Sequence, residues 1–420
     1  MKRTIVEVLE FVEENDVKFI RLAFCDLLGR QKNISITSGE LLRAFEEGIR
    51  FDAWGVDGFW DGERADLLLV PQPDTMCVLP WRPQQSSVVR FYCTIQYPDH
   101  TPFICDARTL LQDTVETFQK EGYSCQIGTE CEFYLFKTDE NGDATTVPLD
   151  RGGYFDVAPL DKGENIRREI CLCLEEMEIS PETSNHEQGP GQNKIDFKFS
   201  DTVSSADNFL TFKNVVSSIS ARNGLSASFV PKPLKTESGN GMHIHISLKG
   251  NEFLPNKSMQ ERKQDFESFI AGILKHIREI TLFLNPLNNS YERLGSFEAP
   301  KYVSWSRQNR AQLISIPVSR KGQLRFELRS PDPMLNPYVA FALIIHAGME
   351  GVRNQLDLPQ QTQDNFLEEP QVDVLQLAKL PMNLLEAIEE AAQSDFVRSV
   401  LGEQGLKQYL QVARREWDTR

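Results

Sequence analysis

Residues 128–136 read Gly-Thr-Glu-Cys-Glu-Phe-Tyr-Leu-Phe, a pattern in which polar and apolar side chains alternate. Successive side chains of a β-strand point to opposite faces, so Glu130, Glu132 and Tyr134 would share one face. The segment therefore predicts a strand with an apolar row on one side and two carboxylates on the other. After residue 102, strand-like and helix-like segments alternate, which indicates an α+β unit built around a sheet.

Two later segments show the same alternation. In residues 241–247, which read Gly-Met-His-Ile-His-Ile-Ser, the polar side chains of one face would be His243, His245 and Ser247. In residues 324–329, which read Leu-Arg-Phe-Glu-Leu-Arg, they would be Arg325, Glu327 and Arg329. Taken singly, each polar row is typical of the solvated face of an antiparallel sheet.

Together, the three rows favour a site for a metal ion and a phosphate group. Two carboxylates on one strand repel each other unless a cation or a proton lies between them. An imidazole on a neighbouring strand would suit a divalent ion such as Mg²⁺ or Mn²⁺. The arginines that flank Glu327 would add positive charge where an anion must dock, as phosphoryl transfer requires.

The bulk composition narrows the class of protein. The chain has 420 residues, 40% of them hydrophobic and 25% charged, which is typical of a globular protein with two or three structural units. Its net charge of −16 disfavours partners such as nucleic acid or an anionic membrane. The eight cysteines lack zinc-finger spacing, early acidic residues interrupt any signal peptide, and no apolar run is long enough to span a membrane. We therefore expect a cytoplasmic protein.

The chain divides into two expected domains. Residues 1–101 contain short apolar runs separated by Gly, Pro, Asp and Asn, which predicts a small strand-rich domain with one opening helix. Asp106 can cap a helix over residues 107–120, so we place the start of a second domain, residues 102–420, just before it. Further helices are expected over residues 166–177, 206–223, 263–284, 337–353, 375–393 and 395–417, strands over 126–136, 242–248, 312–317 and 324–329, and a loop over 355–372.

A series of motifs spread along the chain occurs in a recognisable order. They are Phe51-Asp52, Glu130-Cys131-Glu132, Gly152-Gly153-Tyr154-Phe155, Asn185-His186-Glu187, Gly191-Gln192-Asn193, Gly241-Met242-His243, residues 285–300, Asn309-Arg310 and residues 325–338. In these motifs the chain resembles the glutamine synthetase family over essentially its whole length, and their spacing favours the bacterial type I branch. The resemblance implies an N-terminal β-grasp domain and a large catalytic domain with a partly open, barrel-like sheet surrounded by helices.

The resemblance also implies an activity, cofactors and an assembly. The family ligates ammonia to the γ-carboxylate of glutamate through a γ-glutamyl phosphate, with ATP giving ADP and phosphate. Two divalent ions, Mg²⁺ or Mn²⁺, would be held, one by Glu130, His243 and Glu327 and the other by Glu132 and Glu187. Subunits would form hexameric rings stacked as a dodecamer, with each active site between adjacent subunits.

The remaining matched residues take roles by their positions in the motifs. Glutamate would be bound by Arg293, Arg329, Tyr154 and Gly239, and ATP by Arg310, Arg325, His245 and Ser247. Glu298 would accept a proton from the attached ammonium as the catalytic residue of a flap, with Arg310 steadying the acyl phosphate. Asp52 would reach into the ammonium pocket from a neighbouring subunit, beside Tyr154 and Glu187.

Some of these residues have simpler interpretations. Arg293 and Glu298 could form only a surface ion pair. Tyr154 could pack against its neighbour in the chain, and Asp52 could cap a turn. We expect His186 to be structural rather than a ligand.

A few residues depart from the family pattern. Lys194 stands where the family has a glutamate of the second metal site, and Asp196 could replace that ligand. Trp54 replaces a hydroxyl residue near the ammonium pocket, and Ser315 replaces an arginine that contacts phosphate. These departures leave two alternatives open: a γ-glutamyl ligase that acts on a larger amine, and a catalytically impaired relative.

Overall fold

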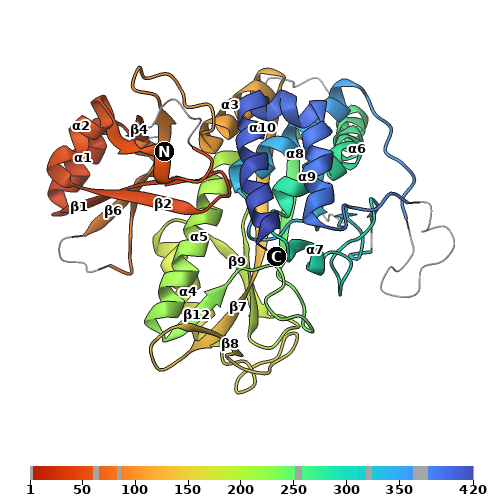
Figure 1. Ribbon diagram of the computed structural model, residues 1–420, viewed down its shortest axis with the longest axis horizontal. Coiled ribbons are helices and arrows are strands. Elements are labelled where there is room, and N and C mark those ends of the chain that lie inside the picture. Colours follow the sequence, from red (N-terminus) through yellow and green to blue (C-terminus); the bar gives the residue numbers. More distant parts are fainter. Residues whose placement is uncertain are drawn as a thin grey trace.

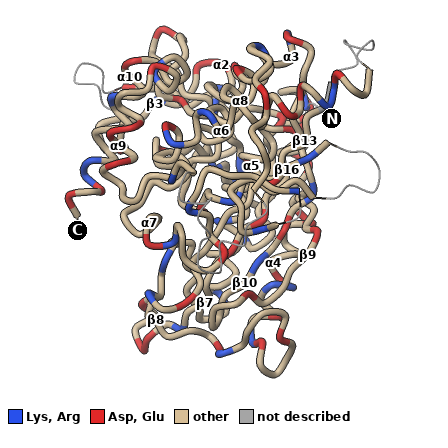
Figure 2. Tube along the Cα trace, turned by 90° about the vertical axis from the view of Figure 1, so that its right-hand side faces the viewer, with Lys and Arg blue, Asp and Glu red and all other residues tan. Residues whose placement is uncertain are grey.

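Two sheets organise the protein. The computed structural model describes residues 3–59, 66–82, 87–250, 258–307, 309–317, 324–362 and 377–419. Figure 1 shows a smaller unit, which contains the first sheet with α1 and α2, beside a larger unit in which helices gather around the second sheet. Figure 2 shows acidic and basic residues interspersed along the described trace. None of the described helices is long and apolar enough to cross a membrane.

The smaller unit contains a mixed sheet with the strand order β2-β1-β6-β4-β3, and β5 also pairs with β6. Its elements are α1 (Ile5–Glu14), β1 (Phe19–Cys25), β2 (Gln31–Thr37), η1 (Ser38–Glu40), α2 (Leu41–Glu46), β3 (Ile49–Asp52), η2 (Ala53–Gly55), β4 (Asp66–Pro71), η3 (Pro73–Thr75), β5 (Cys77–Val78) and β6 (Val88–Gln96). Strand β1 runs parallel to β6 and antiparallel to β2. The opening helix begins with a capping box, because Thr4 and Glu7 satisfy each other's backbone N–H groups.

The larger sheet has the strand order β14-β15-β16-β13-β7-β10-β9, and β8, β11 and β12 also pair with β7. Its strands are β7 (Tyr123–Thr138), β8 (Ala144–Pro148), β9 (Pro181–His186), β10 (Gln192–Phe197), β11 (Ser200–Asp201), β12 (Leu225–Ser228), β13 (Met242–Gly250), β14 (Trp305–Ser306), β15 (Ile314–Ser315) and β16 (Arg325–Leu328). Along β7, Cys131 and Phe133 are buried while Glu130 and Glu132 remain partly exposed, which confirms the alternation predicted for this segment.

The larger unit contains most of the helices. They are α3 (Ala107–Lys120), α4 (Glu164–Glu176), α5 (Thr202–Arg222), α6 (Met259–Leu284), α7 (Ser290–Arg293), α8 (Pro337–Arg353), α9 (Leu384–Gln393) and α10 (Asp395–Asp418). The bounds predicted for α3 and α8 are confirmed. Helices α5 and α6 start four residues earlier than predicted, where Asp201 and Ser258 cap them.

Two predicted ranges were too long. The helix expected over 375–393 begins only at Leu384, because Asn383 caps it by accepting from the N–H of Glu386 at 2.9 Å. The strand expected over 312–317 is limited to β15. Residues 363–372 of the predicted loop, and residues 375 and 376, lie outside the described residues.

The smaller unit contacts the start of α8. Asn336, which caps α8, donates from its side-chain amide to the carbonyl oxygens of Asp26 at 3.3 Å and Leu27 at 3.1 Å. Gly29 has a positive φ of 76°, and a Cβ there would lie 2.6 Å from the Cα of Asn336. Only glycine therefore fits both the turn and the contact.

Helices α6 and α8 pack against each other through glycines. A Cβ on Gly272 of α6 would collide with the carbonyl oxygen of Ala347, and a Cβ on Gly351 of α8 would collide with the carbonyl oxygen of Ser268. In both cases the obstacle is backbone, which cannot rotate away as a side chain can. The close approach buries the apolar faces of both helices.

We expect Gly351→Ala to destabilise the protein by about 1–3 kcal/mol, because the added methyl group forces two helix backbones apart. The urea midpoint of the fluorescence or circular-dichroism transition would measure the loss. Gly39→Ala is the control, since a Cβ at Gly39 meets nothing within 4 Å. Equal midpoints for the two variants would contradict this account of the packing.

Candidate functional site

Four neighbouring strands of the larger sheet carry polar side chains toward one region. In the register, Glu130 on β7 lies opposite His243 on β13 and also opposite Asp196 on β10. His245 lies opposite Glu327 on β16. The three rows predicted from the sequence are therefore adjacent in space, although they come from distant parts of the chain.

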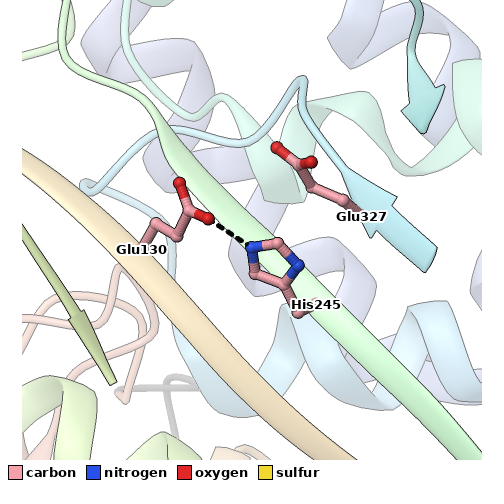
Figure 3. Close-up of side chains that lie close together, drawn as sticks. All are labelled: Glu130, His245 and Glu327. Atoms are coloured by element: carbon pink, nitrogen blue, oxygen red, sulfur yellow. Dashed lines mark hydrogen bonds and ion pairs between the residues drawn. The ribbon is translucent and has the colours of Figure 1, made fainter. Parts of the chain in front are cut away.

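Glu130, His243, His245 and Glu327 form a carboxylate–imidazole cluster. Glu130 Oε1 lies 2.6 Å from His245 Nε2, and Glu130 Oε2 lies 3.3 Å from His243 Nδ1. His243 Nδ1 is also 3.1 Å from Glu327 Oε1. Figure 3 shows Glu130, His245 and Glu327 extending from three strands, with the Glu130 carboxylate hydrogen-bonded to the imidazole of His245.

The carboxylate–imidazole cluster fits a divalent ion. Ligand atoms of Glu130, His245 and Glu327 all lie within 4.8 Å of one another. Burial alone would raise the pKa of Glu327, but the hydrogen bond and charge of His243 and the charge of Arg329 lower it to about 2. The carboxylate of Glu327 is thus ionised at neutral pH, and carboxylate oxygens combined with imidazole nitrogens form a ligand set that suits a cation such as Mn²⁺. His245, expected beside ATP, lies in this cluster together with His243.

Lys194 lies beside the same carboxylates. Its Nζ is 3.2 Å from Glu130 Oε2, 3.6 Å from Glu187 Oε1 and 4.0 Å from Asp196 Oδ1. Burial alone would lower the pKa of Lys194, but Glu130, Asp196 and Glu187 raise it above its ordinary value. The expectation that Asp196 points toward this region is confirmed.

The pair expected to hold a second ion, Glu132 and Glu187, therefore has an ammonium group next to it. Glu132 Oε2 already accepts the N–H of Gly241 at 2.8 Å. Burial, followed by the charge of Glu132, raises the pKa of Glu187 to about 7, while Lys194 acts in the opposite direction. These residues do not fit a divalent ion as the resemblance implied.

A cavity opens beside the carboxylate–imidazole cluster. Among the described residues it is lined by Glu132, Glu187, Gln188, Ser238, Gly239, His243, Arg293, Ser296, Phe297, Glu298, Ala299 and Arg329. Most of the expected glutamate-binding residues are brought together here. Gln188, Ser238 and Phe297 were not predicted; their only signal in the sequence is that each lies next to a predicted residue.

Two arginines, Arg293 and Arg329, line one wall of the cavity. Arg293 is buried and donates to the carbonyl oxygens of Ser330 at 2.7 Å and Arg329 at 3.1 Å. Glu298 is paired instead with Arg329 Nη2 at 3.5 Å, and it accepts from Gln188 at 3.2 Å. A simple surface ion pair between Arg293 and Glu298 is therefore the wrong interpretation.

Other expected site residues lie outside the described lining of the cavity. Asp52 is exposed in the smaller unit and caps η2 by accepting the N–H of Trp54 at 2.9 Å. Tyr154 is half exposed, with its ring centroid 3.9 Å from that of Phe155. Both contacts match the simpler interpretations of these two residues.

The residues expected around the nucleotide lie on three segments: β13, β16 and the residues before β15. Arg325 on β16 pairs in the register with Ser247 on β13, whose hydroxyl donates to the carbonyl oxygen of Leu324 at 3.4 Å. Arg310 is exposed. Ser315, which replaces an arginine, is buried on β15 opposite Glu327. The chain therefore places a small hydroxyl beside a cluster carboxylate at that position.

His186 is structural, as expected. Its Nε2 lies 2.9 Å from Asp150 Oδ1, and its Nδ1 lies 2.7 Å from the carbonyl oxygen of Glu187. Asp150 is buried and also accepts the N–H groups of Gly152, Lys162 and Gly191 at 2.9–3.2 Å. Although Asp150, Asp161 and His186 lie close enough to hold a metal ion, their acceptors are already used. Asp150 and His186 therefore fix the loop that positions Glu187.

We expect Asp150→Asn to lower the stability of the protein by about 3–5 kcal/mol, because it removes the charge that the buried imidazole and three backbone groups require. Differential scanning calorimetry would measure the fall in Tm. Asp143→Asn, in an exposed turn, should change stability by less than about 0.5 kcal/mol. If the two variants have the same Tm, Asp150 does not anchor this loop.

The comparisons with known proteins agree over the whole length. Residues 16–98 match the family model described as "Glutamine synthetase, beta-Grasp domain", and residues 104–420 match "Glutamine synthetase, catalytic domain". The chain is 45% identical to a glutamine synthetase of Methanosarcina mazei over 418 residues, covering 98% of this chain and 94% of that protein. It is 42% identical to one of Clostridium saccharobutylicum over 423 residues, covering 99% and 96%.

Solved structures show the same architecture. A structure described as a GmaS/ADP complex superposes with a TM-score of 0.87 at 26% identity, covering all of this chain and 96% of that one. A Plasmodium falciparum glutamine synthetase gives a TM-score of 0.87 at 23% identity, covering 99% and 96%, a likeness of fold alone. The predicted α+β class, with a β-grasp domain and a curled, partly open sheet surrounded by helices, is confirmed.

Proposed function

Because the chain belongs to the glutamine synthetase family, we propose that it is an enzyme that uses ATP to ligate ammonia to the γ-carboxylate of glutamate. The observation that supports this most directly is the convergence of Glu130, His243 and Glu327 from three adjacent strands beside a cavity lined by Arg293 and Arg329. Metal ligands and guanidinium groups next to one cavity are what phosphoryl transfer to a carboxylate needs.

We assign one divalent ion to the carboxylate–imidazole cluster. Glu130, His243 and Glu327 would hold Mg²⁺ or Mn²⁺, with His245 close enough to bind or to orient Glu130. When bound there, the ion would supply positive charge that offsets the negative charge developing during phosphoryl transfer. Arg310 and Arg325 would bind the phosphates of ATP. Ser247, which lies opposite Arg325 in the register, would lie beside them.

In the first step, glutamate would be held by the positive wall of the cavity. Arg293 and Arg329 would bind its carboxylate groups, and Gly239 lets the loop pack closely against Pro231 and Arg293, because a Cβ there would lie 2.5 Å from the carbonyl oxygen of Pro231. An oxygen of the γ-carboxylate attacks the γ-phosphorus of ATP, and ADP leaves. The product is a γ-glutamyl phosphate.

In the second step, ammonia attacks the acyl carbon and phosphate leaves. The nitrogen must lose a proton, and Glu298 at the mouth of the cavity is the acceptor we propose. It is half exposed and held by Gln188 and Arg329, so it can reach solvent as well as substrate. Tyr154, Glu187 and Asp52 would bind the ammonium ion before it is deprotonated.

Asp52 supports a proposal about assembly. It belongs to the smaller unit and is absent from the described lining of the cavity, so a neighbouring subunit would have to supply it. We propose hexameric rings stacked as a dodecamer, and a cytoplasmic location. The domain boundary between residues 101 and 102 remains a prediction.

We expect the purified protein to convert ATP, glutamate and ammonium to equal amounts of ADP and glutamine in the presence of Mg²⁺ or Mn²⁺. Removal of the metal with EDTA should abolish both products, because the ion must offset phosphate charge. Coupled ADP release and chromatography of glutamine would measure them. Release of ADP with a larger amine that ammonium cannot match would instead favour a γ-glutamyl ligase for that amine, which the family comparison does not favour.

We expect Glu298→Gln to lower kcat by roughly 10²–10⁴-fold with little change in the KM for ATP, since an amide cannot accept the proton. Steady-state kinetics would measure both constants. Glu292→Gln, an exposed neighbour on α7, is the matched control and should keep wild-type kcat. An unchanged kcat in Glu298→Gln would remove it from the mechanism.

A further inference from the structure

The ammonium group of Lys194 occupies the centre of a group of carboxylates. Three of them lie within 4.0 Å of Nζ: Glu130 at 3.2 Å, Glu187 at 3.6 Å and Asp196 at 4.0 Å. The Lys194 side chain is only 16% exposed, and the three acids are 9–21% exposed. The ammonium group donates a hydrogen bond to Glu130, and it forms ion pairs with Glu187 and Asp196.

The position of Lys194 is fixed by the sheet. Lys194 lies on β10, which is hydrogen-bonded on one side to β7 and on the other to β9. In the register it is opposite Glu132 on β7 and Asn185 on β9. The backbone therefore cannot move the lysine away without breaking two ladders, and its stem reaches from an interior strand directly to the acids.

A divalent ion beside Glu187 would meet a fixed positive charge. The ammonium already offsets part of the negative charge that would attract such an ion, and it repels a second cation placed among the same carboxylates. Glu132 is a poor replacement ligand because one of its oxygens accepts the N–H of Gly241 at 2.8 Å. In contrast, Glu327 and the two imidazoles of the carboxylate–imidazole cluster lie on the far side of Glu130 from Lys194.

We propose that the Lys194 ammonium is a built-in substitute for one of two divalent ions, so that each chain binds a single ion, at the carboxylate–imidazole cluster. The inference rests on the proposed function but concerns only the cations. It means that one of the two cationic groups at the site is part of the chain itself and does not depend on the concentration of free metal. The dependence of activity on metal concentration should therefore follow the binding of one ion per chain.

The test is a count of bound Mn²⁺ in the full-length, nucleotide-free protein. Titration followed by the electron paramagnetic resonance signal of free Mn²⁺ gives the number of ions per chain. We expect one ion in the wild type and two in Lys194→Glu, which replaces the ammonium with a fourth carboxylate. Lys194→Met, which removes the charge without adding a ligand, should bind a second ion at least about tenfold more tightly than the wild type does.

Two further variants locate the ions. Lys198→Glu makes the same change of charge at an exposed residue just beyond β10, and it should still bind one ion. Glu327→Gln should lose the ion that the wild type binds. If Lys198→Glu gained an ion as readily as Lys194→Glu, the effect would be one of net charge alone, and the inference would be overturned.

The outcomes separate this inference from the proposed function. Two ions in the wild type would overturn the role of Lys194 and leave a metal-dependent ligase intact. One ion in every Lys194 variant would also overturn it, because the ammonium would then exclude nothing. No ion in the wild type would remove the metal site itself, and with it the basis of the proposed ligase.

Discussion

The antiparallel register of β7 against its two neighbours is the constraint on which the site depends. It places Glu130 between His243 on β13 and Asp196 on β10, and it places Lys194 beside Glu132. A slip of one residue would turn the polar row of β7 toward the apolar side of the sheet. Chemistry and core packing are therefore fixed by the same hydrogen bonds, since Cys131 and Phe133 are buried only in this register.

The sequence predicted which side chains share a face, but not what each of them contacts. Alternation along one strand is a local property, so the pair of Glu130 and Glu132 could be read directly. The bond from His245 to Glu130 depends instead on how two strands separated by more than a hundred residues are aligned. The family resemblance placed His245 beside ATP, and the structure adds its bond to Glu130.

The starts of α3 and α8 were predicted correctly because one capping residue marks each of them. The start of α9 was predicted too early because apolar residues continue the helical pattern before its cap. Helix α3 follows Asp106, and α8 follows Asn336 just before a proline, so both starts were predicted correctly. Before α9, apolar residues continue the helical pattern across Pro381, and only the structure shows that Asn383 begins the helix. The loop that carries Glu187 had no periodic signal, because it is ordered by hydrogen bonds from His186 and Gly191 to Asp150, which lies outside the segment.

The contact between Gly29 and Asn336 ties the two units together mechanically. Asn336 caps the start of α8 and donates hydrogen bonds to the carbonyl oxygens of Asp26 and Leu27. Only a short connection separates it from β16, the strand that carries Glu327. The turn of the smaller unit, the start of α8 and the strand that carries Glu327 therefore follow one another along a continuous path. The placement of the smaller unit against the catalytic sheet thus depends on a joint that tolerates no extra atom.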